Sequence, residues 1–235
     1  DALSALLTTR AANKGDKLIA PGYPSRSFLL RKMAHGLSDV LELELAEGND
    51  MPQGQPALPD NEIELVRQWI LFGAPETGNV VDTALINTYY REGGIDDTYA
   101  QHDAPAEGEG FQMYLGRIFL PPLSEREYYI KFDPRMAEGI EVPKIETFMP
   151  EGTHHFVIYS FNQGAGDAYV EGLRDAYDPG AQDSHADIKN PIATGPGHWD
   201  YALPTNTAYF WPGNSVFDLN LHIKNSSPDS IMSSD

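Results

Sequence analysis

The sequence predicts an α+β protein in two domains, a small helical segment followed by an all-β sandwich. The main observation is a change of period: apolar residues recur at helical spacing near the N-terminus and at alternate positions after about residue 125. Between them lies a stretch rich in Gly, Asp, Thr and Ala, which is typical of a linker. We therefore expect a helical domain at 1–76, a linker with a first strand at 77–124, and a β-sandwich at 125–235.

Three helices are expected in the first domain, at Ala2–Arg10, Ser27–His35 and Asp60–Phe72. The third has the clearest pattern, because Ile63, Val66 and Ile70 fall at helical spacing. We expect Asp60 to cap its start and Gly73 to end it in the left-handed conformation.

Short strands are expected in the second domain, where turns rich in Gly, Pro and Asp separate apolar runs. The expected strands lie at Tyr128–Phe132, His155–Tyr159, Thr207–Trp211 and Val216–Ile223. A series of short strands with regular turns is the pattern of a β-sandwich.

Charge and composition exclude several classes of partner and cofactor. The net charge is −19, and only 16 Lys and Arg residues are scattered along the chain, which argues against nucleic acid or an anionic membrane surface as partner. No run of 18 apolar residues occurs, so we expect no membrane-spanning segment. The absence of cysteine excludes disulfides, zinc–thiolate sites and covalent c-type haem attachment in this chain.

Three stretches of the helical segment stand in a characteristic order and spacing: Pro21–Leu29, Asn49–Pro52 and Leu58–Ala74. In this order and spacing they resemble the C-terminal two thirds of a bacterial c-type cytochrome domain. The resemblance implies that Met51, of a Met-Pro pair, takes the position of the axial haem ligand. The Cys-x-x-Cys-His motif that attaches haem c is missing, and the chain begins at Asp1, which suggests a processed or truncated end. Either haem belongs to a longer form, or the segment is a haem-less relic in which Met51 is a surface-loop residue.

Three histidines are candidate metal ligands: His154 and His155 at the start of one expected strand, and His222 on another. Neutral imidazole is a good ligand for copper and zinc. On the strand 216–223 the apolar residues alternate with polar ones, so His222 should lie on the polar face with Asp218 and Asn220. Consecutive residues of a regular strand point to opposite faces, so joint binding by His154 and His155 requires a bulge or a strand that just begins.

The segment Gly152–Tyr159, together with Leu219–His222, resembles the N-terminal domain of the copper type II, ascorbate-dependent monooxygenases, the peptidylglycine hydroxylating family. The resemblance covers roughly residues 125 to 230. It implies a jelly-roll-like sandwich in which His154, His155 and His222 bind one copper that stores and passes electrons. Oxygen activation then occurs at a second copper, in a following domain that this chain lacks.

The two resemblances together predict a bacterial redox protein, periplasmic, secreted or at the cell surface, that is part of a copper-dependent monooxygenase. A second copper domain or a subunit would be its partner. Two alternatives remain open: a non-catalytic β-sandwich that serves as an interaction subunit or cargo of a cell-surface assembly, and a zinc site.

Other residues near the expected site have smaller roles. The ring partners of the ligating histidines are expected among Asp218, Glu151 and backbone oxygens. His185 and His198 could approach the copper as outer groups. The remaining two histidines, His35 and His102, are expected at the surface.

Overall fold

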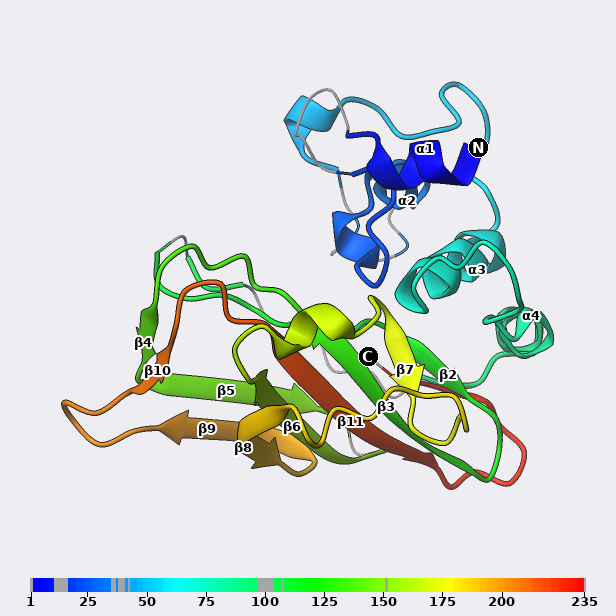
Figure 1. Cartoon of the computed structure of the whole chain (residues 1–235). Coiled ribbons are helices and arrows are strands. Elements are labelled where there is room, and N and C mark those ends of the chain that lie inside the picture. The colour runs from blue at the N-terminus through cyan, green and yellow to red at the C-terminus, as the bar shows by residue number, and fades with distance from the viewer. Residues whose placement is uncertain are drawn as a thin grey trace. The chain divides into compact units, whose positions relative to one another are not determined.

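The computed structural model shows an α+β protein that consists mostly of β-sheet (Figure 1). It describes residues 2–10, 17–34, 37, 41, 43–96, 104–106, 108–150 and 152–234. The chain divides into two compact units. We call residues 1–93 with 171–173 the helical unit, and residues 94–170 with 174–235 the β unit.

All three expected helices are present, and a fourth follows them. The α-helices are α1 (Ala2–Thr8), α2 (Phe28–Met33), α3 (Asp60–Leu71) and α4 (Thr83–Glu92). Short 3-10 turns are η1 (Pro24–Arg26), η3 (Leu45–Glu47) and η4 (Ala165–Ala168). Helix α4 lies in the stretch that we expected to be a linker. Its start is fixed by Asp82, whose side chain accepts a hydrogen bond from the backbone N–H of Leu85 at 2.9 Å.

The ends of α3 confirm one expectation and correct another. Gly73 has a φ of 91° and donates its backbone N–H to Ile70 at 3.0 Å, as expected for a left-handed helix end. Asp60 is not the cap. It is the first helical residue, Pro59 takes the capping position, and no side chain caps the helix. The carboxylate of Asp60 still lies in the first turn, where the helix dipole favours negative charge.

The helical unit has its own apolar core and two buried ion pairs. The core side chains come from α2, α3 and the segments that precede, connect and follow them: Ile19, Leu30, Ala34, Leu41, Ile63, Ile70 and Ala74. Arg31 on α2 binds both carboxylate oxygens of Glu47, at 2.7 and 2.5 Å, and Arg67 binds Glu64 within α3 at 2.7 Å. Because the side chains of both pairs are at most one tenth exposed, removing one partner would leave a buried charge.

Twelve strands occur in the described part of the chain. They are β1 (Ile95–Asp96), β2 (Ile118–Leu120), β3 (Ser124–Phe132), β4 (Ile140–Val142), β5 (Lys144–Met149), β6 (Thr153–Phe161), β7 (Leu173–Asp175), β8 (Ile188–Thr194), β9 (Gly197–Ala202), β10 (Tyr209–Trp211), β11 (Phe217–Asn225) and β12 (Met232–Ser234). All their residues but the first of β7 belong to the β unit. Strands β3, β6, β10 and β11 occupy the four stretches where the sequence predicted strands.

The largest sheet has five strands in the order β7-β3-β11-β6-β8. Strand β11 is central and pairs antiparallel with both β3 and β6. Smaller sheets are formed by β5 with β9, by β4 with β10, and by β1, β12 and β2. Figure 1 shows β5 and β9 running beside the five-stranded sheet.

The two faces of β11 differ as the alternation predicts. Phe217, Leu219, Leu221 and Ile223 are all buried on one face. The other face carries Asp218, Asn220 and His222. Asp218 and Asn220 are also buried, so both faces of the strand are covered from Phe217 to Leu221. Toward the end of the strand, His222 is partly exposed and Lys224 is exposed.

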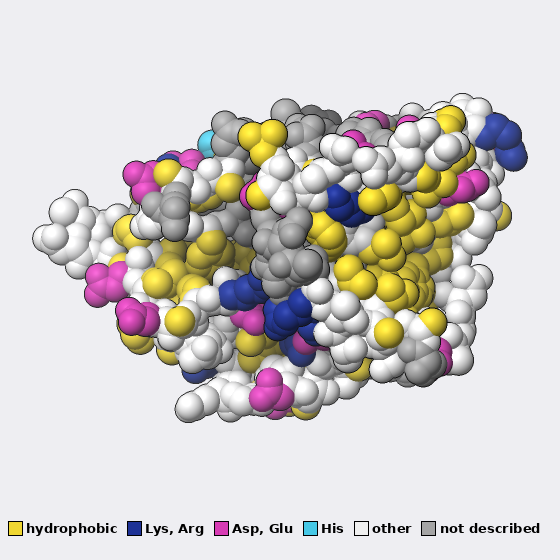
Figure 2. All heavy atoms as spheres, turned by 90° about the horizontal axis from the view of Figure 1, so that it is seen from above, with side chains coloured by type: hydrophobic (Ala, Val, Ile, Leu, Met, Phe, Trp, Pro, Cys, Tyr) yellow, Lys and Arg dark blue, Asp and Glu magenta, His cyan; other side chains and the backbone are white. Residues whose placement is uncertain are grey.

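Among the residues that the structure describes, no helix is both long enough and apolar enough to cross a membrane. Figure 2 shows one face of the molecule, on which Lys and Arg side chains form small groups among acidic and apolar side chains. The described residues of this face therefore form no broad basic surface.

Candidate metal centre

A β-bulge brings His154 and His155 to the same side of the sheet. In the pairing of β11 with β6, His222 lies opposite His155, and Ile223 lies opposite Thr153. His154 is therefore an extra residue with no partner across the ladder. The bulge supplies the break in the pleat that joint binding by two consecutive histidines requires.

The three imidazole rings converge on one point. One nitrogen from each of His154, His155 and His222 lies within 4.8 Å of the others, and the ring centroids are 4.8 to 5.5 Å apart. The Nδ1 atoms of His154 and His222 are 3.2 Å apart. Two nitrogens at about 2.0–2.1 Å from one ion in tetrahedral geometry would be separated by about 3.3 Å. The spacing therefore suits two ligands of the same ion.

A carboxylate orients the ring of His222. Nε2 of His222 lies 2.7 Å from Oε1 of Glu125, on the neighbouring strand β3. A carboxylate can only accept, so Nε2 carries the proton and the lone pair of the neutral ring resides on Nδ1. This is the carboxylate–histidine arrangement found around protein metal ions.

An amide orients the ring of His155 by the same logic. Asn220 donates its side-chain Nδ2 to Glu127 at 3.0 Å and to the carbonyl of Tyr128 at 3.3 Å. Its Oδ1 must therefore be the atom that faces Nε2 of His155 at 3.0 Å, and it accepts the proton there. His155, like His222, is left with its lone pair on Nδ1. Both Nδ1 atoms thus carry a lone pair that a metal ion can use. At His222 the ion would replace the 3.2 Å hydrogen bond between this atom and Nδ1 of His154.

Solvent reaches the site from one side. His154 is exposed, whereas His155 and His222 are half-buried. The candidate donors are three neutral nitrogens. The carboxylate of Glu125 contacts the ring of His222, and the carboxylate of Glu127 accepts from the side chain of Asn220. Such a set can hold copper or zinc.

Asp218 was expected as a ring partner, and this expectation is wrong. Its carboxylate is buried beneath Arg174, whose Nη2 lies 2.7 and 2.6 Å from its two oxygens, and it also accepts from the hydroxyl of Ser184. Burial raises the pKa of Asp218, while Arg174 and Ser184 act in the opposite direction. Register explains the error, because Asp218 lies opposite Tyr159 and Lys131, well along the strand from His155 and Glu127. Glu151, the other expected carboxylate, lies outside the described residues.

Neither His185 nor His198 joins the cluster. His185 contacts Asp183, and its Nε2 lies 3.4 Å from the hydroxyl of Tyr129. His198 stacks on Phe148 with ring centroids 4.3 Å apart. The predicted surface positions of His35 and His102 lie outside the described residues.

Met51, the candidate haem ligand, belongs to the helical unit, whereas all three clustered histidines belong to the β unit. Its side chain is 43% exposed, and its backbone N–H donates to the backbone carbonyl of Lys32 at 2.7 Å.

Sequence reasoning missed Glu125, Glu127 and the specific role of Asn220. Glu125 and Glu127 alternate along β3, and Glu127 lies directly opposite His222 on β11. The alternation of Glu125, Glu127 and Tyr129 with Arg126 and Tyr128 is visible in the sequence, but the register that brings this face beside His222 is not.

Comparison with protein-family models, with curated proteins and with solved structures finds no match to this chain.

Proposed function

We propose that this protein binds one copper ion through His154, His155 and His222 and is the electron-transfer part of a copper-dependent monooxygenase. The observation that carries the proposal is the convergence of three imidazoles, two of which are oriented by Glu125 and Asn220 so that their lone pair lies on Nδ1. Bound copper would supply one-electron redox chemistry, because imidazole ligands tolerate both of its oxidation states. The chain's own residues would hold the ligand rings in place.

The proposal includes the finer architecture that the two resemblances imply. The helical unit would be a cytochrome c-like domain and the β unit a jelly-roll-like copper domain. Haem c needs attachment cysteines, which this chain lacks, so Met51 would be a haem ligand only in a longer form that contains them. The proposed partner is a second copper domain or subunit, and the proposed location is the bacterial periplasm, the cell surface or the medium.

Zinc is the competing occupant that the geometry favours most, because zinc also takes three histidines in a tetrahedral site. A second alternative is a non-catalytic interaction subunit of a cell-surface assembly. The exposed aromatic side chains of Phe210 and Trp199, 66% and 45% exposed, support that alternative.

The test is a titration of the metal-free protein with Cu²⁺ and, separately, with Zn²⁺. We expect one tightly bound copper per chain, a type 2 electron paramagnetic resonance spectrum with nitrogen hyperfine structure, and reversible reduction. His154→Ala and His222→Ala should each abolish stoichiometric binding. His185→Ala is the matched control, because His185 lies in the same unit outside the cluster, and it should bind copper like the wild type.

Each other outcome selects an alternative. No stoichiometric uptake of either metal contradicts the metal-site proposal and favours the interaction subunit. If the protein binds zinc and copper cannot displace it, the site is redox-inactive, and this outcome rules out electron transfer. Equal loss of copper in His185→Ala and in His222→Ala would mean that the three-histidine cluster is not the site.

A further inference from the structure

The β unit contains a cavity of about 1180 Å³ on the opposite face of the five-stranded sheet from the histidine cluster. Its walls come from the irregular segment 108–115, from β5 and from the apolar face of β6 and β11. Phe156 and Leu221, which line it, are adjacent in sequence to His155 and His222 and point to the other face.

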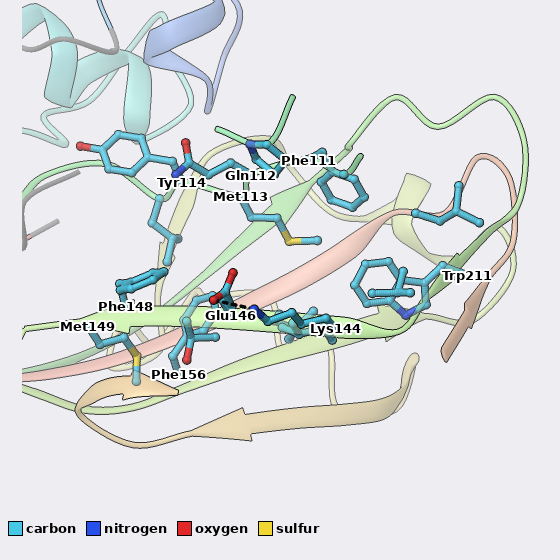
Figure 3. A pocket seen from close by; sticks show the side chains of 18 of the residues that line it. Phe111, Gln112, Met113, Tyr114, Lys144, Glu146, Phe148, Met149, Phe156 and Trp211 are labelled. Atoms are coloured by element: carbon cyan, nitrogen blue, oxygen red, sulfur yellow. Dashed lines mark hydrogen bonds and ion pairs between the residues drawn. The ribbon is translucent and has the colours of Figure 1, made fainter. Parts of the chain in front are cut away.

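The cavity wall is mainly apolar and rich in aromatic rings and thioethers. In Figure 3, Phe111 and Met113 extend from the upper segment toward β5, Trp211 lies at one end, and Met149 and Phe156 lie below. Small-molecule sites are typically of about 300–1,000 Å³ with mostly apolar walls and a few polar groups. This cavity is large enough for such a ligand, and methionine side chains adapt to its shape.

The charged groups at the cavity disfavour an anionic ligand. Lys144 lines the cavity, and its Nζ lies 2.9 Å from Oε1 of Glu146 and 3.1 Å from Oδ2 of Asp200. One positive group is therefore already shared by two negative groups. An acidic ligand would have to compete with both carboxylates for Lys144.

Two polar groups in the wall are unsatisfied. Thr147 on β5 and Thr153 on β6 both line the cavity and are 7% and 2% exposed. Neither hydroxyl oxygen has a hydrogen-bond partner among the residues that the structure describes. Buried hydroxyls are normally paired. A threonine side chain has three staggered rotamers, so each hydroxyl can turn toward a ligand that offers a partner.

We propose that this cavity binds an uncharged apolar small molecule that carries one hydroxyl or carbonyl group, with Thr147 and Thr153 as its hydrogen-bonding partners. Apolar walls provide most of the affinity, and the two threonines select for the polar group. The proposal does not use the histidine ligands, so it stands or falls independently of copper binding.

The experiment uses the full chain and the neutral fluorescent dye N-phenyl-1-naphthylamine, displaced by 1-dodecanol or by dodecanoate at pH 8. We expect saturable dye binding near one per chain, and displacement by dodecanol at a concentration at least about tenfold lower than by dodecanoate, a difference of one decade in dissociation constant. Absence of saturable binding would overturn the proposal. Equal or better displacement by dodecanoate would overturn the assignment of an uncharged ligand.

Two sets of variants locate the binding. Met113→Asp places a charge in the cavity from an irregular segment and should weaken dye binding at least about tenfold. Val170→Asp, at an exposed position that does not line the cavity, is the control and should bind the dye like the wild type. If both variants bind equally well, the dye lies elsewhere and the cavity is not its site.

The nearly isosteric change of Thr147 and Thr153 to Val tests the polar contact. Displacement by dodecanol should become about tenfold weaker, while dye affinity is retained. Unchanged displacement by dodecanol would show that the threonines do not select the ligand. Retained dye binding and an unchanged urea midpoint establish that the double variant is folded.

Discussion

The Nδ1 atoms of His154 and His222 face each other at 3.2 Å, although the two residues are 68 positions apart in sequence. Two local features produce this proximity. Antiparallel pairing of β6 with β11 places His155 opposite His222, and the bulge turns the extra residue, His154, to the same side. A regular strand would have directed His154 to the cavity face.

Glu125→Ala should weaken copper binding about 10- to 100-fold, because the ring of His222 loses the carboxylate that fixes its orientation. Glu146→Ala is the matched control, since both glutamate side chains are 43% exposed and Glu146 lies on β5 away from the cluster. Competition with a copper chelator measures both affinities. Equal affinities in the two variants would show that Glu125 does not position His222.

Asn220→Ala should lower the free energy of unfolding of the metal-free protein by about 1–3 kcal/mol. Asn220 is 1% exposed, and its removal leaves Nε2 of His155 and the carbonyl of Tyr128 without this partner. Urea unfolding followed by circular dichroism measures the change. A loss smaller than about 0.5 kcal/mol would contradict a structural role for this amide in the apo protein.

Asp218→Ala should destabilise the protein by about 3–5 kcal/mol, because it leaves Arg174 as a buried charge without its carboxylate. The double variant Asp218→Leu, Arg174→Met should recover most of this loss, since neither charge remains. Glu146→Ala breaks an exposed ion pair instead and should change stability by less than about 1 kcal/mol. Urea midpoints at pH 7 compare the three, and a double variant no more stable than Asp218→Ala would contradict this account.

Stability should fall at alkaline pH in part through Tyr169. Burial and its 2.6 Å hydrogen bond to Asp187 raise the pKa of Tyr169 from 10.0 to about 12. A raised pKa means that the protonated form of Tyr169 is favoured in the folded state. The contribution of Tyr169 to the free energy of unfolding is therefore complete below about pH 10 and is lost as the pH rises toward 12. Tyr169→Phe removes the group, and the difference in unfolding free energy from the wild type should shrink across that interval. A difference that stays constant from pH 9 to 12 would contradict the shift.

Ile70→Ala should destabilise the helical unit by about 2–5 kcal/mol, because the fully buried side chain leaves a cavity in the core around α3. Leu45→Ala is the control, since Leu45 is fully exposed and should change stability by less than about 0.5 kcal/mol. Thermal unfolding monitored at 222 nm provides the comparison. Similar midpoints for the two variants would mean that this core contributes little to stability.

Much of the secondary structure could be predicted because local patterns specify it. The apolar spacing in Asp60–Leu71 and the alternation in Phe217–Asn225 both appear in the structure as expected. Helix α4 was missed, because the composition of this stretch was interpreted as a linker; only Ile86 is buried on the helix. The predicted N-terminal cap of α3 was wrong by one residue, because the sequence alone does not determine helix ends to the exact residue.

The three histidines of the candidate site were predictable from the sequence, and the side chains around them were not. His154, His155 and His222 were identified from the sequence, and so was the need for a bulge between the first two. The ring partners were not, because Glu125 lies 97 positions from His222 and only the register of β3 against β11 brings them together.

By itself the sequence determined the strand and helix periods, the polar face that carries His222, and the exclusion of cysteine chemistry. The tertiary structure alone decided which side chains hold the rings, that Asp218 pairs with Arg174, and that a cavity lies behind the cluster. The spacing of apolar residues is a local property of neighbouring residues. Register and packing depend instead on contacts between strands that are distant in the chain.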